Sequence, residues 1–124
     1  MGQYTAPLRD MQFVLHEVLN VEAELKAIPK HAALDVDMIN SITEEAGKFA
    51  SEVIFPLNQS GDEEGCTLDK ASGVVNAPKG FKEAYAQYVE GGWAALSCDT
   101  EYGGQGLPHF VNNAFYEMLN SANQ

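Results

Sequence analysis

Apolar residues recur at helical spacing near the start of the chain. One face is formed by residues separated by steps of four and three, and further apolar residues widen it at its start: Val14, Val18, Val21, Leu25 and Ile28, with Leu8, Met11 and Leu15. Because an α-helix turns about every 3.6 residues, the pattern predicts an amphipathic helix over residues 10–28. Asp10 is suited to cap this helix, Asn20 to break it and Pro29 to prevent its continuation.

A second stretch has the same helical spacing. Its apolar positions are Ile39, Ile42, Ala46, Phe49 and Val53. Asp35 or Asp37 is predicted to cap the start of this helix, where an acidic side chain also suits the helix dipole. Pro56 is expected to end the helix or to kink it, because proline lacks a backbone N–H and clashes with the preceding turn.

The pattern changes between residues 58 and 80. Glycine and acidic residues at 61–65 predict an exposed turn. Short apolar runs at 66–68 and 74–75 flank turn-forming residues at 69–73, which indicates a small hairpin. Because an isolated two-stranded hairpin is only marginally stable, we expect this one to lean on the helices.

Two more helices are predicted in the last third of the chain. The third spans residues 81–89 and is stopped by two glycines, whereas the fourth starts near Pro108 and continues almost to Gln124. Their apolar positions are Phe81, Ala84, Tyr85 and Tyr88 in the third, and Phe110, Ala114, Met118 and Ala122 in the fourth. The sequence therefore predicts an all-α protein, an orthogonal or up-down bundle of four to five helices with a hairpin or irregular excursion near residues 58–80.

The charge of the chain excludes several classes of partner. Seven basic and 18 acidic residues give a net charge of −11. This charge argues against binding to nucleic acid or to an anionic membrane surface, both of which attract lysine and arginine. We find neither a run apolar enough to span a bilayer nor a secretion signal, and Cys66 and Cys98 are expected to be free thiols. A cytoplasmic protein is therefore predicted.

Residues with catalytic or metal-binding spacing are not evident. The histidines are scattered, at His16, His31 and His109. Residues 35–37 begin like a calcium loop, but Asn40 and Ala46 occupy the positions that require glycine and glutamate. The glycines at 103–106 match neither a Walker loop nor a dinucleotide fingerprint and predict a tight turn before a helix. We therefore predict no catalytic, cofactor-binding or metal-binding residue in this chain.

One glycine-rich stretch resembles a motif of a known enzyme family. Residues 99–107 read DTEYGGQGL, which resembles the PEEYGGxGL stretch of acyl-CoA dehydrogenases. The family pattern usually begins with proline, whereas Asp99 and Thr100 occupy that lead-in here. Further stretches resemble the family in the same order along the chain: residues 4–15, 80–85, 91–93 and 117–122. Residues 4–15 resemble an extension found in one larger branch, which includes long-chain-like and methylthio-propanoyl-CoA dehydrogenases.

The resemblance implies that this chain is a fragment of a larger enzyme. Family members have an N-terminal helical domain, a middle β-domain and a C-terminal helical domain, with FAD and a catalytic glutamate associated with the later domains. Residues 1–30 would then be N-terminal extension helices and residues 31–124 the N-terminal helical domain, without the other two domains. The parent enzyme would dehydrogenate acyl-CoA thioesters and pass electrons to an electron-transfer flavoprotein, while this fragment would be inactive and would hold no cofactor.

The resemblance also suggests which residues lie near substrate and how the fragment associates. The expected outer wall of the substrate cavity is formed by Tyr102, Gly103, Gly104, Gly106, Phe110 and Met118. A homo-oligomer is expected, and the fragment is expected to dimerise through its exposed apolar face. The alternative function is that of a stand-alone acidic helical module for protein interaction.

Overall fold

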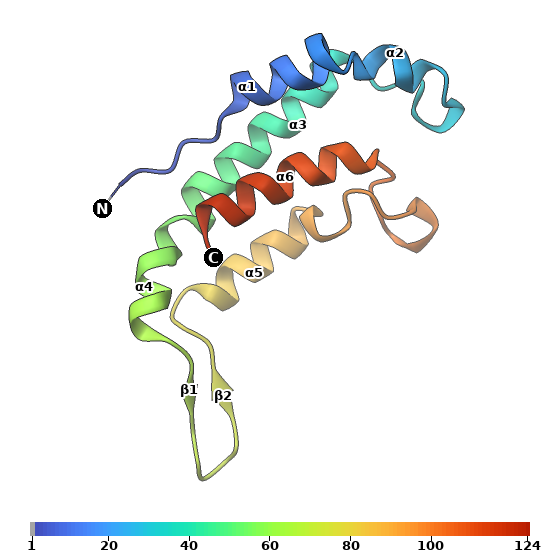
Figure 1. The fold of residues 1–124 in the computed structure, drawn as a ribbon. Coiled ribbons are helices and arrows are strands. Elements are labelled where there is room, and N and C mark those ends of the chain that lie inside the picture. The colour runs from blue at the N-terminus through green and yellow to red at the C-terminus, as the bar shows by residue number, and fades with distance from the viewer. Residues whose placement is uncertain (1) are drawn as a thin grey trace.

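Helices dominate the computed structural model, which describes residues 2–124 (Figure 1). The α-helices are α1 (Leu8–Gln12), α2 (Val21–Lys26), α3 (Val36–Phe49), α4 (Pro56–Glu64), α5 (Phe81–Glu90) and α6 (His109–Ala122). A two-stranded sheet is formed by β1 (Thr67–Leu68) and β2 (Val75–Asn76). The predicted all-α class with a hairpin excursion is confirmed. Two of the predicted helices are each divided, which gives six α-helices.

The first predicted helix is divided into two helices, and the side that it buries differs from the predicted side. Asn20 adopts a left-handed conformation with φ of 47°, which confirms the predicted break. The helix starts at Leu8, so Asp10 lies inside α1 and the predicted cap is wrong. A π-helical turn at Phe13–Val18 follows α1. Met11 and Leu15 are buried, whereas Val14 and Val18 are 45% and 60% exposed, so the predicted buried face is wrong at these two valines.

The second predicted helix continues as two helices joined by a π-helical turn. The Met38 backbone N–H donates to Asp35 Oδ1 at 2.8 Å, which confirms Asp35 as the N-cap of α3. A π turn at Ala50–Ile54 then connects α3 to α4, and Pro56 occupies the first turn of α4, where its missing N–H costs little. Pro56 therefore marks the start of a helix and does not end the helical region.

The predicted exposed turn at residues 61–65 is wrong, because α4 continues to Glu64. Gly61 lies inside this helix and is buried against the ring of Phe81. A Cβ at this position would lie 2.5 Å from Phe81 Cε2, so glycine allows α4 and α5 to approach closely. Gly65, with φ of 65°, ends the helix.

The hairpin projects away from the helices (Figure 1). The two strands are antiparallel, with Thr67 opposite Asn76 and Leu68 opposite Val75, as predicted. All four of these residues are exposed, so the expectation that the hairpin leans on the helices is wrong. One hydrogen bond at its base joins the Lys79 N–H to Glu64 Oε2 at 3.0 Å.

The core lies between α3, α5 and α6. Helices α3 and α6 cross in the middle of the molecule, with α1 beside α3 and α5 beside α6 (Figure 1). At the centre, the ring of Phe115 stacks on Trp93 with centroids 4.8 Å apart and contacts Phe49 and Tyr88. A smaller core joins Leu15, Val21, Leu25 and Ile39. Each core contains residues of α3 or α6. These two helices therefore fix the positions of the surface features described below.

Candidate functional site

Polar residues do not converge into a reactive set within residues 2–124. There is no cluster of three or more histidine, cysteine or acidic side chains able to hold a metal ion in this part of the chain. His16 Nε2 lies 2.7 Å from Asn40 Oδ1, so this histidine is engaged in a pair that joins the π turn to α3. The candidate site is therefore a binding surface, and two features of the molecule qualify.

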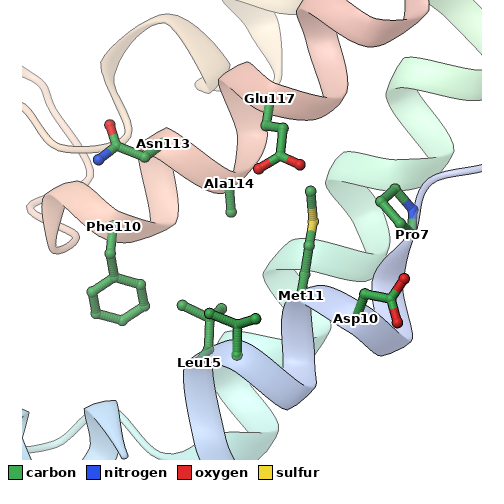
Figure 2. Close-up of a pocket in the computed structure, with 9 residues that line it drawn as sticks. Pro7, Asp10, Met11, Leu15, Phe110, Asn113, Ala114 and Glu117 are labelled. Carbon is green, nitrogen blue, oxygen red and sulfur yellow. The ribbon is translucent and has the colours of Figure 1, made fainter. Parts of the chain in front are cut away.

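The first feature is an apolar groove between the N-terminal helix and the last helix. It has a volume of about 400 Å³. Met11 and Leu15 come from one wall, and Phe110 and Ala114 of α6 form the other (Figure 2). Because α1 and α6 lie a hundred residues apart along the chain, the groove exists only in the folded molecule. We call it the α1–α6 groove.

Two carboxylates stand at one end of the α1–α6 groove, while Phe110 and the amide of Asn113 lie at the opposite end (Figure 2). Glu117 projects from α6 near Met11, and Asp10 lies on α1 beside Pro7 (Figure 2). Neither carboxylate takes part in an ion pair or a side-chain hydrogen bond with another described residue. Burial, followed by the negative charge of Glu117, raises the pKa of the nearby Tyr4 hydroxyl. No basic side chain lines the groove, so its polar end favours a cation.

The second feature is the glycine-rich loop before α6. The N–H of Gly104 donates to the carbonyl of Asp99 at 3.0 Å, and the N–H of Gly106 donates to that of Cys98 at 2.9 Å. A Cβ on Gly104 would lie 2.1 Å from the Cys98 carbonyl oxygen, which requires glycine there. The predicted tight turn is present, and the backbone N–H groups of Gly104 and Gly106 donate to carbonyl groups of the same loop.

A long-range ion pair joins this loop to the 3₁₀ turn at Pro29–His31. Asp99 Oδ1 accepts from the N–H of Glu101 at 2.9 Å, and Lys30 Nζ lies 3.4 Å from Asp99 Oδ2. The Glu101 hydrogen bond and then Lys30 lower the pKa of Asp99 below its usual value. Because both partners are exposed, the pair positions the loop without adding much stability.

The residues predicted to form a substrate-cavity wall divide into four groups. Tyr102 is 84% exposed at the tip of the loop and Gly103, with φ of 83°, follows it. Gly104 and Gly106 shape the base of the same loop. Phe110 lines the α1–α6 groove, whereas Met118 is fully buried in the core and has no surface to offer. The role of these residues as a cavity wall stays a prediction.

Sequence reasoning missed the residues that face Phe110. Met11 and Leu15 were assigned to the margin of a helix face, and Glu117 was noted only within a family-like segment. The available signal was the spacing of Met11, Val14 and Leu15 by three and four residues, which places them on one face of a helix but does not identify what that face contacts. Their contact with α6 required the three-dimensional arrangement.

A smaller hollow of about 290 Å³ separates α5 from the end of α6 and contains two tyrosines. Burial, followed by the neighbouring hydroxyl of Tyr116, raises the pKa of Tyr88 from its ordinary value of 10 to about 12. The folded state therefore retains the Tyr88 proton at a pH where the unfolded state releases it. The stability that results is fully present below pH 10 and is lost as the pH rises towards 12.

We expect Tyr88 to be among the last tyrosines to ionise in an alkaline titration followed by ultraviolet absorbance. The Tyr88→Phe variant is expected to lack the highest midpoint and to unfold at a higher pH than the unaltered chain. Tyr85→Phe is the matched control because Tyr85 lies one turn away and is mostly exposed. An unchanged titration curve for Tyr88→Phe would contradict the assignment.

Comparison with known proteins confirms the resemblance seen in the sequence. No family model matches the chain. A 3-methylmercaptopropionyl-CoA dehydrogenase of Ruegeria pomeroyi is 40% identical over 119 residues, which cover 96% of this chain and 20% of that protein. A broad-specificity linear acyl-CoA dehydrogenase of Mycobacterium tuberculosis is 28% identical over 123 residues, 99% of this chain and 20% of that protein. The chain thus spans about a fifth of the length of these curated relatives.

Proposed function

We propose that this chain is the N-terminal helical domain of a flavin-dependent acyl-CoA dehydrogenase. The observation that supports the proposal most strongly is the 40% identity to a 3-methylmercaptopropionyl-CoA dehydrogenase along 96% of the chain. In this proposal, residues 1–30 are extension helices, residues 31–124 are the helical domain, and the longer enzyme introduces a double bond between the α and β carbons of an acyl-CoA thioester. The catalytic base lies outside residues 1–124.

The described residues do not fit a flavin dinucleotide. The α1–α6 groove is lined by two carboxylates and by no basic side chain, so it would repel the phosphates of this cofactor. The amides of Gly104 and Gly106 are already bound to carbonyl groups of the same loop and are not free to hold a phosphate. We therefore assign the FAD site to the remainder of the longer enzyme and derive no step of the reaction from this chain.

In this proposal, the domain contributes to the reaction by forming part of the outer wall of the substrate cavity. Tyr102, Gly103, Gly104 and Gly106 supply a rigid loop with an exposed ring, Phe110 supplies an apolar surface, and Met118 supports α6 from the core. Rigid loops that present an aromatic ring lose little conformational entropy on binding. This loop is thus suited to contact an acyl-CoA.

In the full-length enzyme, Tyr102→Ala is expected to raise KM for acyl-CoA about tenfold and to leave kcat within about twofold. The reason is that the ring contributes binding contact and no chemistry. Tyr102→Phe keeps the ring and is expected to behave like the unaltered enzyme. Steady-state kinetics with a saturating electron acceptor measure both constants. An unchanged KM in Tyr102→Ala would remove Tyr102 from the cavity wall.

The proposed function is tested directly on the natural protein. The product of the uninterrupted natural reading frame is purified, and its mass, visible flavin spectrum and reduction by 3-methylmercaptopropionyl-CoA and linear acyl-CoA are measured. We expect a polypeptide about five times as long as this chain, with a flavin band that bleaches on addition of substrate. A native mass of 13.5 kDa without flavin would contradict the proposal and would favour the helical interaction module.

The partners of the longer enzyme follow from the same proposal. We assign it an acyl-CoA substrate, an electron-transfer flavoprotein as electron acceptor, a homo-oligomeric state and a cytoplasmic location. The exposed, unbridged Cys66 and Cys98 support a reducing compartment. None of the helices in residues 2–124 is both long and apolar enough to cross a membrane.

Residues 1–124 alone are expected to self-associate. Four large apolar side chains around the π turn are exposed: Phe13, Val14, Val18 and Leu19. Large apolar side chains left exposed to water tend to find partners. Sedimentation velocity over a hundredfold range of concentration is expected to show a rising weight-average mass, and a constant monomer mass would contradict this expectation.

A further inference from the structure

We propose that Lys30 is a positioning residue for acyl-CoA binding, because it ties the glycine-rich loop, and with it Tyr102, to the segment that follows α2. Lys30 acts through Asp99 and does not itself touch the substrate. The inference rests on the proposed function, since it requires that the exposed ring of Tyr102 contacts an acyl-CoA. It identifies a residue outside the predicted cavity wall that sets the affinity of this contact.

A continuous series of contacts leads from Lys30 to Tyr102. Lys30 Nζ lies 3.4 Å from Asp99 Oδ2. Asp99 Oδ1 accepts from the Glu101 N–H at 2.9 Å. The backbone carbonyl of Asp99 accepts from the N–H groups of Tyr102 at 3.1 Å and Gly104 at 3.0 Å. Asp99 therefore fixes the backbone around Tyr102, and Lys30 fixes Asp99 relative to a different part of the molecule.

Lys30 stands on a part of the chain that is itself held in place. It lies in the 3₁₀ turn at Pro29–His31. Leu25 before this turn is buried in the smaller core, and Leu34 after the turn packs against the same core. Phe110, near the start of α6, packs there as well. The smaller core therefore holds the helix that follows the glycine-rich loop, while Lys30 holds the beginning of the loop.

This ion pair differs from the other two that form within residues 2–124. Those two join side chains three or four positions apart on a single helix. The pair of Lys30 and Asp99 joins segments 69 residues apart, so it restricts the tertiary position of a loop. Both side chains are more than half exposed, and exposed ion pairs contribute modestly. The expected effect is therefore a small change in affinity and not a loss of folding.

The test measures acyl-CoA kinetics of variants of the natural full-length enzyme. Lys30→Gln is expected to raise KM about two- to fivefold, the factor that an exposed ion pair contributes to an equilibrium constant, and to leave kcat unchanged. Lys30→Arg keeps the charge and is expected to retain the original KM. Lys26→Gln is the matched control, because Lys26 pairs with Glu22 on its own helix, and it is expected to leave KM unchanged. An unchanged KM in Lys30→Gln would overturn the proposal.

Two double variants test whether Lys30 acts through Asp99 and Tyr102. Asp99→Asn removes the charge but keeps an oxygen that can accept from the Glu101 N–H, so it is expected to raise KM as Lys30→Gln does. Combining Lys30→Gln with Asp99→Asn is expected to raise KM no further than either change alone. In the Tyr102→Ala enzyme the positioned ring is absent, and Lys30→Gln is expected to have no additional effect. Additive effects in either double variant would overturn the proposal, because Lys30 would then act on the substrate by another route.

Hydrogen exchange measures the tie between Lys30 and the loop without substrate. Exchange of the backbone amides of residues 99–106 is followed by mass spectrometry in the same full-length variants. Lys30→Gln is expected to speed this exchange about two- to fivefold, because a loop that has lost its tether opens locally more often. Lys26→Gln is expected to leave the exchange rate unchanged. Equal exchange rates in the two variants would overturn the proposal.

The two measurements separate this inference from the proposed function. An active flavoenzyme in which Lys30→Gln leaves KM unchanged defeats this inference alone. An unaltered protein that holds no flavin and does not turn over acyl-CoA defeats the proposed function. Faster exchange of the loop in Lys30→Gln would then still support the tie between Lys30 and Asp99.

Discussion

Phe115→Ala lowers the free energy of unfolding by about 3–5 kcal/mol, the range for a buried phenylalanine replaced by alanine. Phe115 is 1% exposed and its ring contacts Trp93, Phe49 and Tyr88. Removing it therefore deletes contacts with α3, α5 and the segment after α5 at once. Because a domain of this size is stabilised by about 5–15 kcal/mol in total, much of the population is expected to unfold at modest denaturant concentration.

Urea denaturation followed by circular dichroism measures this effect. Phe115→Leu keeps most of the volume and is expected to be far less damaging. Tyr102→Ala is the matched surface control, since it removes an aromatic ring that is almost fully exposed and is expected to change stability by less than about 0.5 kcal/mol. A Phe115→Ala midpoint close to that of Tyr102→Ala would show that the aromatic core is not the centre of stability.

Gly104→Ala is expected to have the second-largest effect, a loss of about 1–3 kcal/mol or more. The added methyl group would lie 2.1 Å from the Cys98 carbonyl oxygen and 2.3 Å from its carbon. These are backbone atoms, which cannot turn aside as a flexible side chain can. The loop must therefore open, and the hydrogen bond from the Gly104 N–H to Asp99 is expected to be lost.

Gly103→Ala separates this steric effect from backbone strain. Gly103 has φ of 83°, but no neighbouring atom lies within 4 Å of an added Cβ. Its replacement is expected to cost only the strain of a left-handed alanine, about 1–2 kcal/mol. Thermal unfolding of both variants compares the two causes. If Gly103→Ala proved the more damaging, backbone conformation and not the Cys98 contact would control this loop.

Local signals in the sequence were sufficient for most element boundaries. Asp35 caps α3 as expected, because capping depends on a side chain and a backbone N–H only three residues away. The break at Asn20 also follows from the residue itself, since asparagine tolerates the left-handed conformation. The short hairpin was predictable from the turn residues between its strands.

The errors arise where a distant contact decides the local structure. Gly61 predicts a turn from the sequence alone, but it lies inside α4, where its missing side chain leaves room for Phe81 of α5. The π turn at Phe13–Val18 has no recognisable signal in the sequence, and the burial of Met11 and Leu15 in place of Val14 and Val18 could not be foreseen. The same limit applies to the α1–α6 groove. The sequence identifies Phe110 as a candidate site residue. It does not identify Met11 and Leu15 as the residues that face it, because they lie about a hundred residues away along the chain.

The exposed hairpin has a consequence for how this domain can vary among relatives. The tip between Asp69 and Gly73 is held by its own short-range hydrogen bonds, and both strands are exposed along their length. Lengthening such a loop costs only about 0.6 kcal/mol for each doubling of its length. Insertions and deletions at this tip are therefore nearly neutral for folding, so natural selection can change the length of this arm freely while the aromatic core beneath it stays constant.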